Sequence, residues 1–355
     1  MTPELHIITQ SELANFRDSG QYKHLNEKPI SCERLDSYMH NPHAKPDDIV
    51  LYMLLQDNQL IAYRTILPDD LYGKTPEHFG WCSGNWVHPE HRRKGYSNYL
   101  LKQAMQDWNG KIMYTNYAPE SHALYQKTGQ FTLYSHREGY GFYLYAKTRE
   151  LLRNRVSSVM RFFLFFVDIL VWIVAALRSL MLTPGKNRWS IEEKRNPDSD
   201  YLRMFDARQK VCFEREATDL EWILKYPWVK EKQQQQAYFF SHRAKRFFYR
   251  FIVLKDKKNT KGFAMLQYRD GCLKVPYFQL GSGGHTELAI FLVKFCKRHK
   301  IKLMTIYDPV LSEAVSMVRH PFLYKKQKFQ NVYAAWKPSC RQPLVSDGDG
   351  DYVFT

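Results

Sequence analysis

The segment from residue 79 to residue 108 limits most strongly what this chain can fold into. It begins with FGWCSGNWV (79–87), which predicts a strand. The basic, glycine-containing turn HPEHRRKG (88–95) follows, and then YSNYLLKQAMQDW (96–108), whose apolar residues recur at helical spacing. A turn from a strand into a helix points several backbone N–H groups at one spot, where the helix dipole adds positive potential. The segment predicts either a pyrophosphate-binding turn or a basic helix start exposed to water.

Strand and helix patterns alternate through the first 150 residues. IVLYMLL (49–55) and LIAYRTIL (60–67) flank the turn QDNQ and predict an antiparallel hairpin. KIMYTNY (111–117) predicts a further strand, and SHALYQKTG (121–129) predicts a short helix. These elements indicate one domain over residues 1–150.

The same order of elements recurs towards the C-terminus. Three strand candidates lie between residues 251 and 280, followed by a helix pattern at 287–299 and a strand pattern at 301–308. A chain of 355 residues is long for one compact domain. We therefore expect an α+β protein of two mixed-sheet α/β modules in tandem, with the second over residues 189–355.

The apolar segment 156–182 predicts a helix that joins the two modules, within an apolar or amphipathic connecting helix that we place at residues 151–188. It is interrupted by Asp168, and the apolar run between Arg161 and Arg178 is shorter than the roughly 20 residues that span a bilayer. Peripheral contact with a membrane and burial between two domains are therefore both favoured over a membrane-spanning helix. Flanking basic residues suit the membrane contact but are also ordinary solvated charges.

The amino-acid composition limits the possible binding partners and the cellular location of the protein. The formal net charge of +16 favours polyanions, including nucleic acid, an anionic membrane face and a phosphate-rich cosubstrate. No helix-turn-helix, zinc-finger or RNA-binding motif is evident, which disfavours nucleic acid. The six cysteines are scattered, so we expect reduced thiols, and the N-terminus lacks the pattern of a signal peptide. A cytoplasmic protein follows, with the inner face of the membrane as the alternative location.

Two motifs in the first half resemble those of the GNAT superfamily of N-acetyltransferases. Arg92-x-x-Gly95-x-Ser97, preceded by Val87-x-Pro89, is similar to the acetyl-CoA signature (R/Q)-x-x-G-x-(G/A). Asn116 and then ALYQKTGQF (123–131) are similar to the family's next landmarks. The resemblance covers residues 1–148 and departs from the signature at Ser97, where the family carries glycine or alanine. It implies a GNAT fold and acetyl-CoA as cosubstrate.

The resemblance also implies a role for each matching residue. The backbone from Arg93 to Ser97 would hold the pyrophosphate, and Tyr125 would act as the general acid that protonates the departing thiolate of CoA. Asn116 would bind the pantetheine arm, next to backbone groups of the strand that precedes the turn. The complete set of implied cosubstrate-binding residues is Trp86, Val87, Arg92, Arg93, Lys94, Gly95, Tyr96, Ser97 and Asn116.

A general base is harder to find, because the strand at 79–87 carries no Asp or Glu. Glu77 and His88 at its two ends are the nearest candidates, and neither is assigned. In the second half, Gly281 to Gly284 occupy the position of the phosphate turn without any Arg or Lys, which indicates a degenerate copy. The acidic ending DGDGD (347–351) lacks the glutamate of a calcium-binding EF-hand loop, so no metal is expected.

These observations lead to one function and one alternative. We expect transfer of an acetyl group from acetyl-CoA to an amine of a small-molecule or peptide acceptor, by direct attack without a covalent enzyme intermediate. The alternative is a non-catalytic module that binds acyl-CoA, or a membrane-associated scaffold.

Overall fold

The computed structural model describes the chain except for residues 1, 117–118, 145–151, 153–156, 183, 198, 204–211, 214, 232–237, 241, 341–344 and 355. The described residues divide into two compact units. Unit 1 comprises residues 1–136, 197–245 and 330–355, and unit 2 comprises residues 137–196 and 246–329. The units are therefore interleaved along the chain, whereas the sequence predicted consecutive modules with boundaries at residues 150 and 189.

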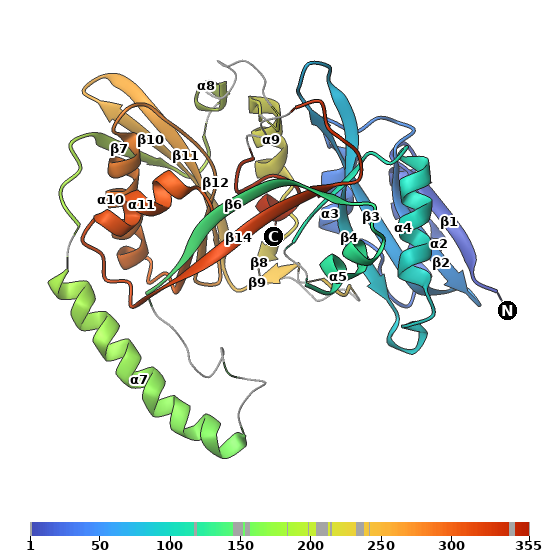
Figure 1. The fold of residues 1–355 in the computed structure, drawn as a ribbon, viewed down its shortest axis with the longest axis horizontal. Coiled ribbons are helices and arrows are strands. Elements are labelled where there is room, and N and C mark those ends of the chain that lie inside the picture. Colours follow the sequence, from blue (N-terminus) through green and yellow to red (C-terminus); the bar gives the residue numbers. More distant parts are fainter. Residues whose placement is uncertain are drawn as a thin grey trace. The chain divides into compact units, whose positions relative to one another are not determined.

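Unit 1 is built on a mixed sheet (Figure 1). Neighbouring strands run in the order β1 (Glu4–Thr9), β2 (Ile49–Gln56), β3 (Gln59–Leu71), β4 (Glu77–Val87) and β5 (Ile112–Thr115). All pairs are antiparallel except β4 and β5, which are parallel. The predicted hairpin is thus β2 and β3, and its turn residues Asp57 and Asn58 have positive φ, as a tight hairpin turn requires.

Helix α4 (Tyr96–Asp107) covers one face of this sheet, as the apolar spacing predicted (Figure 1). Leu100, Leu101 and Ala104 are buried against side chains of β2 and β3. The other N-terminal helices are α1 (Leu13–Asp18), α2 (Gly20–His24), α3 (Cys32–Met39), the short 3-10 helix η1 (Pro89–His91) and α5 (Pro119–Lys127).

Unit 2 repeats the order of elements of unit 1. Strands β10 (Phe247–Asp256), β11 (Asn259–Arg269) and β12 (Cys272–Leu280) precede α10 (Gly284–Arg298), and β13 (Leu303–Ile306) precedes α11 (Pro309–Met317). Strand β7 (Ser190–Lys194) pairs with β10, and β12 and β13 are parallel, as β4 and β5 are. Helices α4 and α10 each begin after a glycine with positive φ, Gly95 before α4 and Gly283 before α10.

The last strand of each sequence half belongs partly to the other unit, which explains the interleaving. Strand β14 (Tyr324–Ala334) ends the second half, yet its residues 332–334 pair with β5 of unit 1. Strand β6 (Thr132–Tyr143) ends the first half, yet its residues 140–143 pair with β13 of unit 2. The two halves therefore exchange their final strands, a pairing that the order of elements alone does not predict.

Residues 197–245 and 330–355 complete unit 1 with α8 (Ser199–Leu202), α9 (Ala217–Lys225), β8 (Lys230–Glu231), β9 (Arg243–Ala244) and the terminal 3-10 helix η3 (Tyr352–Phe354). A disulfide joins Cys212 to Cys340 across 128 positions of sequence. This corrects the expectation that all the cysteines are reduced, which rested on their scattered spacing. The fold brings the two sulfurs together although they are far apart in the chain.

The apolar connection forms the predicted helix, α7 (Ser158–Met181), in unit 2. Among the described residues, Val159–Met181 is the segment that is long and apolar enough to cross a membrane by length and composition.

Candidate active site

The turn between β4 and α4 has the backbone shape of an anion cradle. Arg93 has a φ of 64° and Gly95 a φ of 86°, a region that glycine adopts without steric cost. The first intrahelical bond of α4 runs from the Tyr99 N–H to the Gly95 carbonyl at 3.0 Å. The N–H groups that precede Tyr99 therefore point out of the helix start, where a negative group is favoured.

A cavity of about 840 Å³ opens at this turn. Most of the predicted cosubstrate residues line it, namely Trp86, Val87, Arg92, Arg93, Gly95, Tyr96 and Ser97. Lys94 lies in the same turn and is exposed. Phe239 and Phe240 also line the cavity, although they lie far along the sequence and no motif pointed to them.

Strands β4 and β5 separate next to the cavity. Their pairing consists of Gly80 with Ile112 and Trp81 with Met113, and beyond Trp81 the described part of β4 has no partner in β5. The two strands are therefore splayed beyond Trp81. Asn116, after β5, holds β14 instead, because its Oδ1 accepts a hydrogen bond from the Asn331 N–H at 2.9 Å.

Tyr125 on α5 is buried, and its hydroxyl accepts a hydrogen bond from Arg64 Nη1 at 3.0 Å. Burial raises the pKa of Tyr125 well above its usual value, although the charge of Arg64 opposes the shift. The phenol is therefore protonated at neutral pH and can act as a proton donor. The Arg64 guanidinium also donates to the Ser97 carbonyl at 3.3 Å, so it connects the phenol with the start of α4.

The side chain that departs from the family signature, Ser97, has a partner within the fold. Its hydroxyl donates to Asn85 Oδ1 at 2.8 Å. The serine is accommodated because the neighbouring strand β4 supplies an acceptor for it.

Ser83 lies at a bulge in β4. The register passes from Thr65–Gly84 to Ile66–Cys82, so Ser83 is the extra residue of β4. Its hydroxyl donates to Asp351 Oδ2 at 2.8 Å. A carboxylate thus lies beside residues 79–87, which have none of their own.

Buried Arg34 and the end of the chain hold this carboxylate in place. Arg34 donates to the Ser83 hydroxyl and, at 2.8 Å, to Thr65 Oγ1. The Phe354 ring stacks on Trp228 with ring centroids 4.6 Å apart, which anchors the residues after Asp351. The sequence signal for this group was the DGDGD ending, which was considered only as a calcium ligand.

The two base candidates at the ends of β4 are engaged elsewhere. Glu77 accepts hydrogen bonds from the Ser339 N–H at 2.6 Å and from Trp336 Nε1 at 3.0 Å. His88 caps η1, with its Nδ1 accepting from the Glu90 N–H at 3.4 Å.

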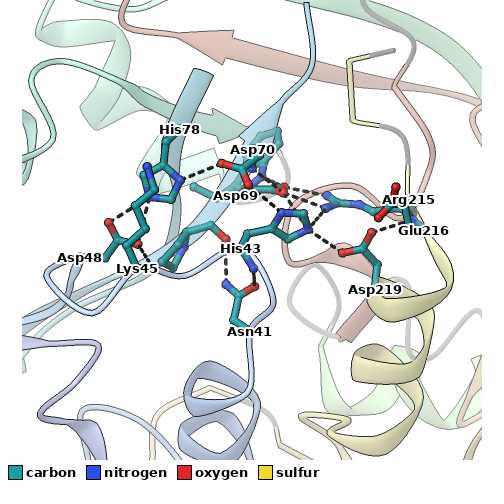
Figure 2. Close-up of polar contacts among 12 residues, drawn as sticks. Asn41, His43, Lys45, Asp48, Asp69, Asp70, His78, Arg215, Glu216 and Asp219 are labelled. Carbon is teal, nitrogen blue, oxygen red and sulfur yellow. Dashed lines mark hydrogen bonds and ion pairs between the residues drawn. The ribbon is translucent and has the colours of Figure 1, made fainter. Parts of the chain in front are cut away.

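A buried network of histidines and aspartates lies at the far end of the β3–β4 hairpin (Figure 2). His43 lies between Asp70 and Asp219, at 3.1 and 2.5 Å. Arg215 forms two hydrogen bonds with Asp69, at 2.8 and 2.7 Å. These contacts join residues 215–219 to β3, which makes the network a structural connection within unit 1.

Within the part of the chain that the structure describes, no cluster of three or more His, Cys, Asp or Glu side chains is arranged to hold a metal ion.

The comparisons with known proteins agree with this geometry. The model of the acetyltransferase (GNAT) family matches residues 14–130. These residues are a GNAT domain. The matched range contains the cradle, the splayed strands and Tyr125, and members of the family use acetyl-CoA, as the sequence predicted. No curated protein matches the chain.

Solved structures extend the likeness in fold to nearly the whole chain. A probable N-acyltransferase from Enterococcus faecalis has 10% identity and a TM-score of 0.53, and the match covers 94% of this chain and 73% of that one. N-myristoyltransferase from Saccharomyces cerevisiae with bound myristoyl-CoA has 12% identity and a TM-score of 0.53, with coverage of 96% and 84%. These structures confirm the mixed-sheet GNAT-like fold. The family match at residues 14–130 supports acyl-CoA-dependent acyl transfer as the class of activity.

Proposed function

We propose that this protein transfers an acetyl group from acetyl-CoA to an amine of a small-molecule or peptide acceptor. One observation supports this above the others: the cavity at the cradle is connected through Arg64 to the phenol of Tyr125. Arg64 contacts Ser97 and Asn85, which line the cavity, and donates to the Tyr125 hydroxyl. An anion site and a protonated acid on one framework suit cleavage of a thioester of CoA.

In this proposal the phosphates of CoA lie at the turn from Arg92 to Ser97, with Lys94 adding positive charge. Backbone groups of Trp86 and Val87, exposed by the splay, pair with the pantetheine amides, and the ring of Tyr96 borders the same cavity. The side-chain oxygen of Asn116 accepts a hydrogen bond from Asn331. The proposed contact of Asn116 with pantetheine is therefore made by its side-chain NH₂ group.

The reaction proceeds by direct attack. The acceptor nitrogen forms a bond to the thioester carbonyl carbon, the C–S bond breaks, and the sulfur leaves with the electron pair. Tyr125 donates its proton to that sulfur, and the carboxylate of Asp351 takes the proton that the amine loses. Both groups lie near Cys82 of β4. Arg64 Nη1 donates to the Cys82 sulfur at 3.6 Å as well as to the Tyr125 hydroxyl, and the next residue, Ser83, donates to Asp351. No covalent enzyme intermediate is needed.

The turn in unit 2 supports the proposal that residues 189–355 contain a degenerate copy of the module. A Cβ added at Gly95 would have no atom within 4 Å, whereas one at the equivalent Gly283 would lie 3.9 Å from the Trp189 ring. The Glu287 carboxylate in the first turn of α10 accepts from the Arg188 N–H at 3.0 Å. An aromatic ring and a negative charge thus stand where the cradle of unit 1 is open and basic.

Calorimetric titration of acetyl-CoA tests the cosubstrate site. Gly95→Glu places a negative side chain at the phosphates and forces a non-glycine residue into positive φ, so we expect saturable binding by the wild type and none by this variant. Gly110→Glu is the matched control, because Gly110 also has positive φ and open space around it but lies outside the cavity. Absence of binding by the wild type at millimolar acetyl-CoA would refute the proposal.

A turnover assay that measures release of free CoA then distinguishes an acetyltransferase from a non-catalytic acyl-CoA-binding module. A non-catalytic acyl-CoA-binding module would bind acetyl-CoA and release no free CoA with any amine in an acceptor screen.

We also propose a cytoplasmic location for the protein. The Cys212–Cys340 disulfide would be unusual there, since cytosolic proteins rarely carry stable disulfides.

A further inference from the structure

Helix α7 presents its apolar side chains to the outside. Phe162, Leu170 and Trp172 are 63%, 62% and 57% exposed, whereas Ala175 is fully buried. The less exposed positions, including Asp168 and Ala175, recur at helical spacing and form one narrow stripe. In a water-soluble protein the apolar face of a surface helix packs on the core, so the wide outer face of α7 needs an apolar environment of its own.

The chain segments on both sides of α7 belong to the same unit, which limits how α7 can be placed relative to a membrane. The chain before it belongs to unit 2 through the pairing of β6 with β13, and the chain after it belongs to unit 2 through the pairing of β7 with β10. The end of α7 is also held to α10, because Lys297 Nζ donates to the Leu182 carbonyl at 3.1 Å.

A helix that crosses a bilayer once leaves its two ends on opposite sides. Both flanks of α7 enter the same folded unit, so one of them would have to return through the lipid. The preceding flank contains Lys147, Arg149, Glu150, Arg153 and Arg155. Charged side chains are costly in the hydrocarbon, which excludes a single crossing. Although Val159–Met181 is long enough to cross, the run between Arg161 and Arg178 has a length of only about 24 Å at ~1.5 Å per residue, so a crossing would also bring charged side chains into the ~30 Å core of a bilayer.

Charge at the two ends of α7 indicates which surface it meets. Basic residues precede it, and Arg178, Lys186 and Arg188 lie at its end or follow it closely. Cations that flank an exposed apolar helix are attracted to anionic lipid headgroups. A second copy of the chain, with the same positive charge of +16, would be repelled at this place.

We propose that α7 is a monotopic membrane-binding element that lies in the plane of an anionic bilayer surface. Its apolar face, with Phe162, Phe166 and Leu170, enters the boundary between headgroups and acyl chains. Arg178, Lys186 and Arg188 contact the headgroups, and the stripe with Asp168 faces away from the lipid. This inference is independent of the acyl-transfer reaction.

Flotation of the full chain with vesicles tests the proposal. We expect it to float with vesicles of phosphatidylcholine containing about one third phosphatidylglycerol, and at least tenfold less with phosphatidylcholine alone at moderate salt. The variant Phe162→Glu/Phe166→Glu/Leu170→Glu should lose flotation. Met317→Glu is the matched control, because Met317 is an exposed apolar side chain of α11 in the same unit and should not affect flotation.

Fluorescence of Trp172 measures the depth of insertion. We expect a blue shift on addition of anionic vesicles that is lost in Trp172→Phe, and stronger quenching by lipids brominated near the headgroup than by lipids brominated near the chain ends. Strongest quenching at the bilayer centre would overturn the interfacial placement. Equal flotation of wild type and triple variant, or no flotation together with lipid-free self-association that the triple variant loses, would overturn the proposal. Unchanged circular dichroism and thermal unfolding of the triple variant show that it folds.

Discussion

At the scale of single residues, the hydroxyl of Tyr125 carries the proposed acid step. Tyr125→Phe removes one oxygen and keeps the ring that packs in the core, so we expect kcat to fall by about 10²-fold or more while the Kd for acetyl-CoA changes little. Tyr114→Phe is the matched control, since Tyr114 is a buried tyrosine whose ring centroid lies 4.3 Å from that of Tyr125. Full turnover by Tyr125→Phe, or an equal loss in both variants, would contradict the assignment. Steady-state kinetics and calorimetry measure both quantities.

The proposed base is a second prediction at this scale. Asp351→Asn keeps the shape of the side chain and an acceptor for Ser83, but it cannot take a proton. We expect kcat to fall by about 10²-fold and the acid limb of the pH–rate profile to disappear, with acetyl-CoA binding retained. Asp351→Glu should recover part of the rate, which a purely structural role would not predict. If Asp351→Asn has the wild-type profile and acetyl-CoA turnover persists, the base assignment fails while the transferase proposal stands.

At the scale of elements, the Cys212–Cys340 disulfide ties the segment before α9 to the segment after β14. Cross-linking a loop of this length restricts the unfolded chain, so we expect Cys212→Ser/Cys340→Ser to lower the free energy of unfolding by about 2–5 kcal/mol. Cys272→Ser is the control, because Cys272 is an exposed free thiol. Denaturant unfolding with and without reductant measures the difference. Equal stability of the oxidised wild type and the double variant would contradict the prediction.

At the scale of the whole molecule, the buried histidines make stability depend on pH. Burial alone would lower the pKa of His43, but its hydrogen bonds to Asp219 and Asp70 raise it to about 10. Burial likewise opposes the hydrogen bonds of His78 to Asp48 and Asp70, which raise its pKa to about 9. Each value lies above the ordinary histidine pKa near 6.5. The stabilisation is therefore complete below about pH 6.5 and is lost as pH rises towards 9 to 10.

Thermal unfolding at several pH values tests this dependence. We expect Tm to fall between pH 6.5 and pH 10, because the free energy of unfolding falls by up to about 1.4 kcal/mol per pH unit for each histidine. His43→Gln/His78→Gln should be less stable at pH 6 and should lose most of the slope. His24→Gln, at an exposed position, should keep it. A flat stability curve for the wild type over this range would show that the histidines are not charged in the folded protein.

The sequence by itself determined the local elements and the cosubstrate turn. The hairpin of β2 and β3, the apolar face of α4 and the glycine before it depend on residues close together in the chain, so periodicity and a short motif were enough to predict them. The repeated order of elements was visible for the same reason. Apolar spacing also predicted α7, because a helix of 24 residues forms from local hydrogen bonds.

Only the tertiary structure decided which distant parts meet. Ser83 and Asp351 are 268 positions apart, and the exchange of β6 and β14 pairs each strand with the other half of the chain. The disulfide and the contact of His43 with Asp219 are also long-range. A strand with a suitable apolar pattern can pair at more than one sheet edge. A carboxylate in a polar C-terminal segment belongs to no sequence motif from which its partner could be predicted. Burial and packing of the complete chain select these contacts, and they bring a carboxylate to residues 79–87, which have none of their own.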